Sequence, residues 1–508
     1  MRATTRPVLA AVLIILIALA PAAPARAARP AALDWSPCTQ DVTAQCATLQ
    51  VPTDWADPYS ARVGIAVARR PATDPAARIG TLVVNPGGPG GSGVDFAVDS
   101  AYFFSEALRR RFDIVGFDPR GIARSSPVQC TAALSAAVPS PLIESPPAYA
   151  ATIDYNRRLA ADCRAHTGPL FEHVDTLSVV RDTDALRTVL GEPQLSLYGA
   201  SYGSLIGAQY ADRYPDRVRA LVLDSVMDHS VGLDGFLGTE TDAAQDSFNQ
   251  FIGWCGRDVR CAVHGRNVPE IWAGLLARAA AGRLRDPYVP DVAVTVPALL
   301  KVAFTSFYDP QWYALGFYLK LADAEPAAPG GTTAPAPSGL AANSFPAVVC
   351  EDWSLPVAGF AEYRARLAGL RQRAPQMLAS PLALAATAGC LGWPSPPDNP
   401  QHDLRPARTP VLLVNARHDP ATAYPWAQHV AGQLGPNATL LTYDGWGHVA
   451  YNRTACVKGF VDDYLINGVR PAAGARCPAV PPDPYGVGGG VGKHANNGRR
   501  APLRWGYR

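Results

Sequence analysis

The stretch "LSLYGASYGSLIG" at residues 195–207 constrains the fold of this chain most, because it places a G-x-S-x-G pattern between an apolar run and a helix-like run. Glycines at positions 199 and 203 allow the chain to turn sharply from a strand into a helix, so that the hydroxyl group of Ser201 projects from the edge of a sheet. The bare pattern also occurs as an ordinary glycine-rich turn. The strand–turn–helix context, however, is the one that an exposed nucleophilic serine requires, and we predict that Ser201 is a nucleophile.

Short apolar runs that are typical of buried strands alternate with helix-like stretches on both sides of this turn. The strand-like runs lie at residues 81–85, 112–118, 195–199, 219–224, 410–416 and 438–443. The helix-like stretches lie at residues 176–191, 203–213, 422–433 and 454–466. This alternation predicts an α/β fold, with a mostly parallel sheet that has helices on both faces.

The alternation stops between residues 231 and 404, where helix-like and aromatic stretches such as "FNQFIGWC" and "VAFTSFYDPQWYALGFYLKL" prevail. We interpret residues 231–404 as a mainly helical cap that is inserted between two strands of the core. The core itself is then formed by residues 28–230 and 405–480. Residues 481–508 are rich in Gly and Arg, a composition typical of a disordered tail.

The first 27 residues have the features of an export signal. Arg2 and Arg6 precede an apolar run at residues 8–20, and "ARA" supplies small residues up to Ala27. The apolar run is shorter than the about 20 residues that a membrane span needs. We therefore expect cleavage near Ala27 and a secreted protein without stable membrane association.

Ten cysteines agree with an oxidising compartment. The chain has no Cys-x-x-C motif, which disfavours a zinc ribbon and a thioredoxin-like redox site. The sequence does not determine how the cysteines pair. If local loops close first, neighbours pair, as Cys38–Cys46, Cys130–Cys163, Cys255–Cys261, Cys350–Cys390 and Cys456–Cys477.

Charge and composition exclude several partners. The formal net charge is +2 over 508 residues, and no dense block of Lys and Arg indicates nucleic-acid binding. No motif indicates a metal ion or an organic cofactor, so we expect neither, and we expect the chain to be a monomer.

A serine nucleophile needs a base and a carboxylate that orients the base. Asp419 in "LLVNARHDPATAY" follows one strand-like run and His448 in "LLTYDGWGHVAY" follows the next, so both loops reach the sheet edge at which Ser201 turns. Two rival residues are less suitable. Asp444 precedes His448 in the same loop and suits a turn, whereas His418 adjoins Asp419 and would point away from it.

The glycine-rich loop "NPGGPGGSG", which starts at the end of the strand-like run 81–85, is compatible with two chemistries. Its glycines fit the G-x-G-x-x-G pattern of dinucleotide sites, and Asp118 ends the next strand-like run. Two prolines, however, interrupt the loop where it would have to enter a helix. Hydrolysis by a serine nucleophile instead needs two backbone N–H donors for the oxyanion, one from such a loop and one from the residue after the serine. We therefore favour an oxyanion hole formed by Gly88 and Tyr202.

Several motifs together resemble one family. "GGPGG", "FDPRGIARSS", "GASYG", the Asp419 loop and "GHVAYN" resemble the exported tripeptidyl aminopeptidases of actinomycetes, in the proline-iminopeptidase branch of the α/β-hydrolases. The resemblance covers residues from about 34 to 477. It implies an α/β-hydrolase fold with a cap and an exopeptidase that releases short peptides, most typically tripeptides, from free N-termini.

The resemblance also implies roles for particular residues. Matched by motif position, the family's triad corresponds to Ser201, Asp419 and His448, and its oxyanion hole to Gly88 and Tyr202. The loop departs from the family's H-G-G-P-G, because Asn85 and Pro86 precede the glycines. This departure leaves the donor unchanged and alters what surrounds it.

A peptide with a free N-terminus carries an ammonium group, which buried carboxylates bind through charge-assisted hydrogen bonds. The cap segment "VVCEDWS" offers Glu351 and Asp352 for this purpose, and iminopeptidase relatives use acidic cap residues in this way. The alternative for both residues is a surface acid or a helix cap.

Two other functions remain open from the sequence. A carboxylesterase or lipase would have the same triad and oxyanion hole, and only the cap would differ. A catalytically inactive hydrolase fold that binds a ligand is the alternative from another class. The intact set of Ser, His, Asp and oxyanion glycine argues against inactivity.

Overall fold

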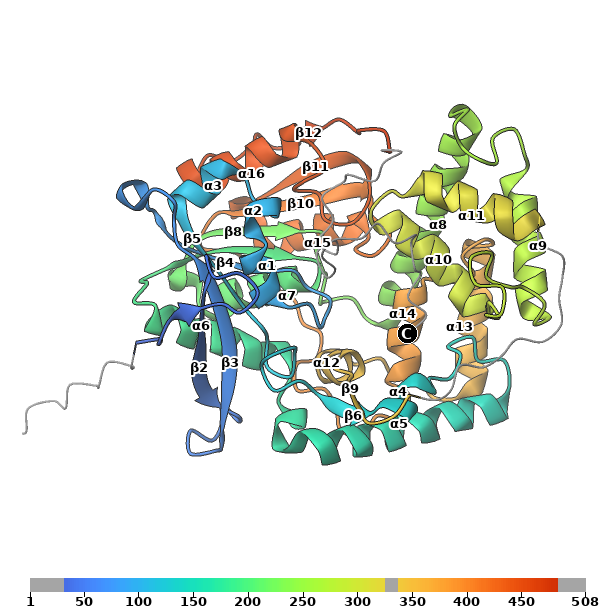
Figure 1. Cartoon of the computed structure of the whole chain (residues 1–508), viewed down its shortest axis with the longest axis horizontal. Helices are drawn as coiled ribbons and strands as arrows, with labels where there is room; N and C mark the ends of the chain where they lie inside the picture. Colours follow the sequence, from blue (N-terminus) through green and yellow to red (C-terminus); the bar gives the residue numbers. More distant parts are fainter. Residues whose placement is uncertain (1–31, 325–336, 483–508) are drawn as a thin grey trace, which may run out of the picture.

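The computed structural model describes residues 32–324 and 337–482 (Figure 1). The predicted export signal and nearly all of the predicted tail lie outside these residues. Among the described residues, no helix is both long enough and apolar enough to cross a membrane.

A ten-stranded sheet forms the core, in the order β1-β2-β3-β5-β4-β7-β8-β10-β11-β12. Strands β1, β2, β3 and β5 pair antiparallel, and all pairs from β5 to β12 are parallel. The strands are β1 (Ser36–Pro37), β2 (Gln45–Pro52), β3 (Arg62–Arg70), β4 (Gly80–Asn85), β5 (Phe112–Phe117), β7 (Leu195–Ala200), β8 (Val218–Asp224), β10 (Val411–His418), β11 (Ala438–Trp446) and β12 (Arg476–Cys477). All six strand-like runs of the sequence are thus confirmed as strands of one sheet.

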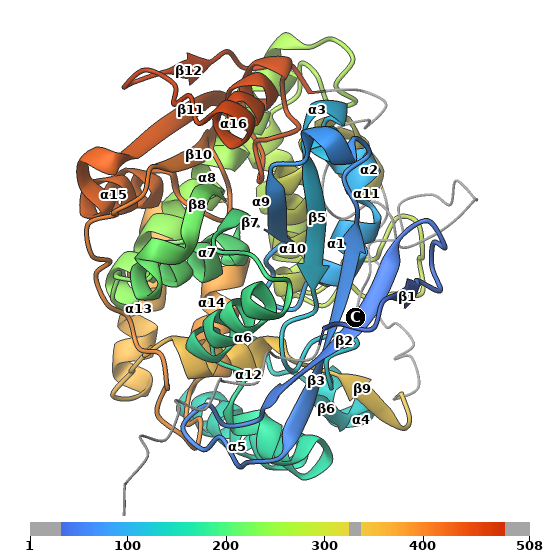
Figure 2. The same ribbon diagram turned by 90° about the vertical axis from the view of Figure 1, so that its left-hand side faces the viewer.

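Helices cover both faces of this sheet (Figure 2). One face packs against α1 (Gly93–Val98), α3 (Glu106–Arg111) and α16 (Ala455–Asn467). The other packs against α6 (Thr176–Val189), α7 (Tyr202–Arg213) and α15 (Tyr424–Leu434). In β4, Leu82 and Val84 contribute to the first layer and Val83 to the second. Because both faces are covered, the parallel strands are continuous apolar runs, as predicted.

A largely helical insertion leaves the sheet between β8 and β10 (Figure 1). Its helices are α8 (Leu233–Arg257), α9 (Val268–Ala280), α10 (Val296–Tyr308), α11 (Trp312–Ala324), α12 (Phe345–Asp352), α13 (Phe360–Arg373) and α14 (Pro381–Gly389). Helices α8 to α11 enclose a hydrophobic core of their own, in which the rings of Phe248, Trp272 and Phe307 are in contact. This core explains the aromatic character of the insertion.

A second segment, which lies within the predicted core range 28–230, packs with the insertion. It comprises β6 (Gln129–Thr131), α4 (Ala132–Ala136) and α5 (Pro146–Thr167). Strand β6 pairs antiparallel with β9 (Leu340–Ala342) of the insertion. The side-chain amide of Asn156 in α5 donates hydrogen bonds of 2.8 Å to the carbonyl groups of Ala388 and Leu391. Contacts between segments so distant in sequence leave no local signal.

All ten cysteines form disulfides, and each pairs with its neighbour in sequence. The pairing therefore agrees with the expectation from local loop closure. One of the five bonds, Cys350–Cys390, joins α12 to the end of α14. Five disulfides are typical of a protein outside the cytoplasm.

Candidate active site

Ser201 lies at a tight turn between β7 and α7, with φ 57° and ψ −126°. The turn brings backbone segments so close together that only glycine fits on either side of the serine. A Cβ atom on Gly199 would lie 2.1 Å from the carbonyl oxygen of Gly203, and a Cβ atom on Gly203 would lie 2.6 Å from the carbonyl oxygen of Asn85. The backbone N–H of Ser201 donates to the Asp224 carbonyl at 2.8 Å, which ties the turn to β8. A non-glycine residue in this conformation is strained, and such residues concentrate at functional sites.

The structure brings Asp419 and His448 together. His448 Nδ1 lies 2.9 Å and 3.0 Å from the two carboxylate oxygens of Asp419. Asp419 follows β10 and also accepts hydrogen bonds from the backbone N–H groups of Ala421 and Thr422 and from the Thr422 hydroxyl. Burial of Asp419 opposes its ionisation, but the adjacent imidazole and these donors outweigh burial and lower the pKa. The carboxylate can therefore hold His448 in one orientation and stabilise its protonated form.

Ser201 is not hydrogen-bonded to this pair: within the described residues, no hydrogen bond joins Ser201 Oγ to His448 Nε2. Hydrogen bonds of this kind are often long without substrate and shorten in the reactive complex. The serine nevertheless lies at the same sheet edge as Asp419 and His448, because strands β7, β10 and β11 are parallel members of one sheet.

Two residues that sequence reasoning missed connect the three predicted triad residues. The Asp224 carboxylate, at the end of β8, accepts the backbone N–H groups of Ala450 and Tyr451, just after His448. Ser225 donates to Asp419 Oδ2 at 2.7 Å and accepts the N–H of Val449 at 2.8 Å. Asp224 ends the buried strand β8 and Ser225 follows it, at the sheet edge where Asp419 also lies. This position is a sequence signal that could have identified both residues.

The two rival residues are engaged elsewhere. Asp444 forms ion pairs with Arg417 and Arg476 at the surface. His418 Nδ1 lies 2.6 Å from Asp246 of the cap helix α8. Neither side chain takes part in the Asp419–His448 pair.

The glycine-rich loop lies directly against the serine turn. A Cβ atom on Gly87 would lie 2.7 Å from the backbone nitrogen of Tyr202. The N–H of Gly87 itself donates to Asn85 Oδ1 at 2.9 Å. In the part of the chain that the structure describes, the N–H groups of Gly88 and Tyr202 form no hydrogen bond, so both are free to bind an oxyanion.

The dinucleotide alternative fits this loop poorly. The Asp118 carboxylate would have to bind a ribose, but it already accepts the backbone N–H groups of Val94 and Arg124 and the Ser92 hydroxyl. Asp118 therefore fixes the loops around the site and has little acceptor capacity left. In the described residues, no group of three or more His, Cys, Asp and Glu side chains is arranged to hold a metal ion.

The insertion covers His448 directly. The carbonyl group of Tyr308, at the end of α10, accepts the His448 N–H at 2.7 Å, and the two rings lie 4.8 Å apart. Glu240 of α8 is buried nearby, and its Oε2 accepts the Ser380 hydroxyl at 2.6 Å. Burial, together with the charge of Asp419, raises the pKa of Glu240 to about 8. Sequence patterns gave no reason to choose Glu240 among the acids of the insertion.

The two acids predicted to bind an ammonium group have different surroundings. Both lie in α12 and are buried. Asp352 accepts four hydrogen bonds, from Thr176 N, Thr176 Oγ1, Tyr202 Oη and Asn399 Nδ2. A carboxylate has about four acceptor positions, so Asp352 has none left for a ligand. Glu351 accepts one hydrogen bond from Ser395, and burial together with Asp398 raises its pKa to about 8.

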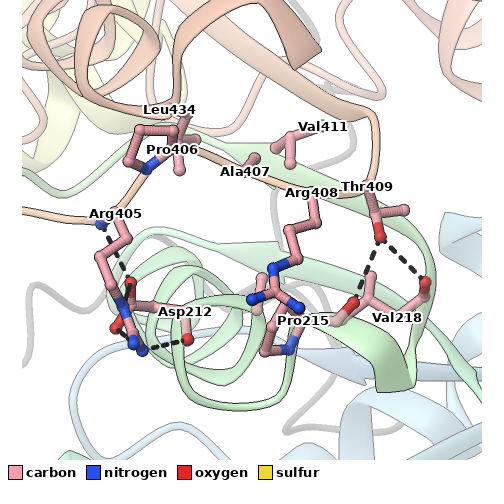
Figure 3. Close-up of a pocket in the computed structure, with 11 residues that line it drawn as sticks. Asp212, Pro215, Val218, Arg405, Pro406, Ala407, Arg408, Thr409, Val411 and Leu434 are labelled. Atoms are coloured by element: carbon pink, nitrogen blue, oxygen red, sulfur yellow. Dashed lines mark hydrogen bonds and ion pairs between the residues drawn. The ribbon is translucent and has the colours of Figure 1, made fainter.

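Figure 3 shows a cavity of about 70 Å³ that none of the three predicted triad residues lines. It is lined by the first residues of β8 and β10, Val218 and Val411, and by Asp212 and Arg405. The amino ends of these strands are opposite to the edge that carries Ser201. Ligands of parallel sheets bind at the carboxyl ends, and the cavity is too small for a peptide.

The strained serine, the buried Asp–His pair and the free N–H groups, on a mostly parallel sheet under a helical insertion, define the class of α/β-hydrolase-fold serine hydrolases. A family model described as "alpha/beta hydrolase fold" matches residues 80–311, and one described as "TAP-like protein" matches residues 375–477.

Three similar proteins span nearly the whole chain. Serine protease Hip1 of Mycobacterium tuberculosis is 31% identical over 499 residues, covering 88% of this chain and 91% of that protein. Carboxylesterase B of the same organism is 32% identical, with 87% and 89% covered. Tripeptidyl aminopeptidase of Streptomyces lividans is 30% identical, with 90% and 89% covered. The chain therefore belongs to the TAP-like family of α/β-hydrolase-fold serine hydrolases.

Proposed function

We propose that this protein is a secreted serine exopeptidase that releases short peptides, most typically tripeptides, from the free N-termini of peptide substrates. The observation that carries the proposal is the buried Asp419–His448 pair beside Ser201, in a chain that is 30% identical to a tripeptidyl aminopeptidase. Export is supported by the five disulfides.

The proposed reaction uses each residue of the site in one role. Ser201 Oγ attacks the carbonyl carbon of the scissile peptide bond while His448 Nε2 takes its proton, and Asp419 stabilises the imidazolium. The N–H groups of Gly88 and Tyr202 bind the oxyanion. His448 then protonates the leaving amine. Water next attacks the acyl carbon while His448 takes its proton, and His448 returns that proton to Ser201 Oγ as the acyl–serine bond breaks.

Recognition of the N-terminus is the part that separates a peptidase from an esterase. An extended tripeptide is roughly 10 Å long, so a carboxylate that binds its amino group need not touch the triad. Glu351, which is buried in α12 and accepts a hydrogen bond from one side chain of the described residues, Ser395, suits this role. Approach of an ammonium group would favour its ionised form despite the raised pKa.

A carboxylesterase is the second candidate, because a relative with this name is 32% identical over 481 residues. The triad and the oxyanion donors would be the same. An esterase, however, has no reason to prefer a substrate that carries a free amine.

The test compares a free-amine tripeptide amide, its acetylated form and a short acyl ester. We expect kcat/KM for the free peptide to exceed that for the acetylated peptide by at least tenfold, because acetylation leaves a buried carboxyl group unpaired. Equal rates for the two peptides, with fast ester hydrolysis, would overturn the peptidase proposal in favour of the esterase.

Glu351→Gln and Glu240→Gln then locate the amine. We expect Glu351→Gln to reduce the preference for the free peptide and to change ester hydrolysis little. If Glu240→Gln reduces the preference instead, the amine lies closer to Asp419, and the released product is shorter than a tripeptide. If neither substitution reduces the preference, the assignment of Glu351 is wrong and the peptidase activity stands.

A further inference from the structure

Helix α12 contacts both segments that would form the oxyanion hole. At its amino end, the Ser344 hydroxyl lies 3.3 Å from the position that a Cβ atom on Gly90 would take, in the glycine-rich loop. At its carboxyl end, Asp352 Oδ2 accepts the Tyr202 hydroxyl at 2.5 Å. Helix α12 therefore contacts the loop that contains Gly88 and also the side chain of Tyr202. The backbone N–H of Tyr202 is the second donor of the proposed oxyanion hole.

The Tyr202 side chain is held at its far end by this contact. Its ring is buried, and its backbone N–H begins α7 directly after Ser201. A buried phenol whose hydroxyl is fixed cannot turn without losing a charge-assisted hydrogen bond, which is stronger than a neutral one. The position of the ring thus restricts the position of the N–H to which it is joined.

Asp352 is itself fixed by a buried polar network. Thr176, the first residue of α6, donates to it through its N–H at 2.8 Å and its hydroxyl at 2.6 Å. Asn399 donates at 2.8 Å and is joined in turn to Gln209 of α7. The disulfide Cys350–Cys390 holds the same helix end from the side of the insertion. Removing one member of such a network affects the others.

We infer that Asp352 is a positioning residue, which holds Tyr202 and through it the oxyanion donor beside Ser201, rather than a ligand of the substrate amine. The inference rests on the proposed hydrolysis by Ser201. It does not depend on whether the substrate is a peptide or an ester, because the oxyanion forms with both.

The experiment measures kcat and KM of Tyr202→Phe and Asp352→Asn with the three substrates named above. We expect both variants to lower kcat about tenfold on all three substrates. This effect is smaller than the ~10²–10³-fold loss that follows removal of a whole oxyanion donor, because the N–H of Tyr202 is displaced and not removed. KM should change less than twofold. The double variant should lose no more than the more affected single variant, since both remove the same hydrogen bond.

The chain offers a matched control on the same helix. Tyr210 of α7 is buried, and its hydroxyl donates to Asp184 at 3.2 Å, far along the helix from Ser201. Tyr210→Phe removes the same kind of bond, and its kcat should stay within twofold of the parent value. If Asp352→Asn fails to fold, Tyr202→Phe still tests the inference, because it leaves the carboxylate and its three other donors in place.

Two results would overturn the inference. A loss confined to the free-amine peptide, with raised KM and normal ester hydrolysis, would make Asp352 an amine ligand. A lowered melting temperature with unchanged kcat on all substrates would make the hydrogen bond merely structural. Failure of the peptidase proposal would look different, since the parent enzyme would then hydrolyse the ester alone, and the ester rates of the variants would still report on the oxyanion hole.

Discussion

At the scale of single residues, the turn at Ser201 and the pair Asp419–His448 make one prediction that is independent of the substrate. Ser201→Ala should lose nearly all activity and keep its fold, with a residual rate of only ~10³–10⁴-fold over the uncatalysed reaction. A phosphonyl fluoride should label Ser201 alone, as peptide mass spectrometry would show. Labelling of another residue would refute the assignment.

Ser225 should be needed for both activity and stability. Its hydroxyl donates to Asp419 and accepts the N–H of Val449, beside His448. Ser225→Ala leaves that buried N–H unpaired, which costs about 1–3 kcal/mol of unfolding free energy. We expect a lower midpoint of urea unfolding and a kcat lowered by about tenfold. A Ser225→Ala enzyme with parent kcat would show that Asp419 and Thr422 suffice to orient His448.

Glu240 should make the protein less stable as the pH rises. Its pKa is raised to about 8 from 4.5, so between these values the folded state binds a proton that the unfolded state does not. The stability contributed by this group is therefore complete below pH 4.5 and is lost as the pH rises towards 8. Glutamine at this position cannot titrate. Relative to Glu240→Gln, the melting temperature of the parent protein should fall steadily from pH 5 to pH 8, and parallel curves would contradict the raised pKa.

Single residues were predictable from sequence where a motif marks them. The serine turn, Asp419 and His448 stand directly after apolar strands, and the structure places them at one edge. Ser225 has the same kind of position but no motif. Asp352 was named for its charge, whereas the structure gives it four donors from three other parts of the chain. The partners of a side chain cannot be read from its neighbours in sequence.

At the scale of elements, the parallel strands and their helices were predictable because burial on both faces makes each strand a continuous apolar run. The antiparallel strands β2 and β3 were missed. In β2, exposed Thr48 and Gln50 alternate with buried Leu49 and Val51. In β3, half-buried Gly64 and Ala66 separate the buried residues Val63, Ile65 and Val67. Neither strand is therefore a continuous run of large apolar residues. Strands β6 and β9 have three residues each and are about 200 residues apart in sequence, so no local pattern predicts that they pair.

A side chain at Gly203, the second glycine of the turn between β7 and α7, should destabilise the fold. A Cβ atom on Gly203 would lie 2.6 Å from the Asn85 carbonyl oxygen and 2.7 Å from its side-chain oxygen. Gly203→Ala must therefore push β4 and α7 apart, and we expect a loss of about 1–3 kcal/mol in unfolding free energy. Gly207→Ala, on the same helix, would meet only the ends of two leucine side chains and is the matched control. Equal stability of the two variants, from urea unfolding, would contradict this packing.

At the scale of the whole molecule, the five disulfides close local loops, with cysteines that are at most 40 residues apart in sequence. The purified protein should contain fewer than one free thiol per chain when it is denatured without reductant and treated with a thiol reagent. Several reactive thiols would show that the cysteines are not paired as in the structure.

The segment of β6, α4 and α5 packs against the insertion, which is synthesised much later than this segment. Asn156 meets its carbonyl partners 232 and 235 residues later in the sequence. During synthesis, α5 therefore emerges long before α14, and its contact surface stays exposed to water until α14 has been made. Contacts of such long range slow folding, and exposed apolar surface in an unfinished chain favours aggregation. The Cys130–Cys163 bond closes within 33 residues, so it can give this segment its shape before its partner exists.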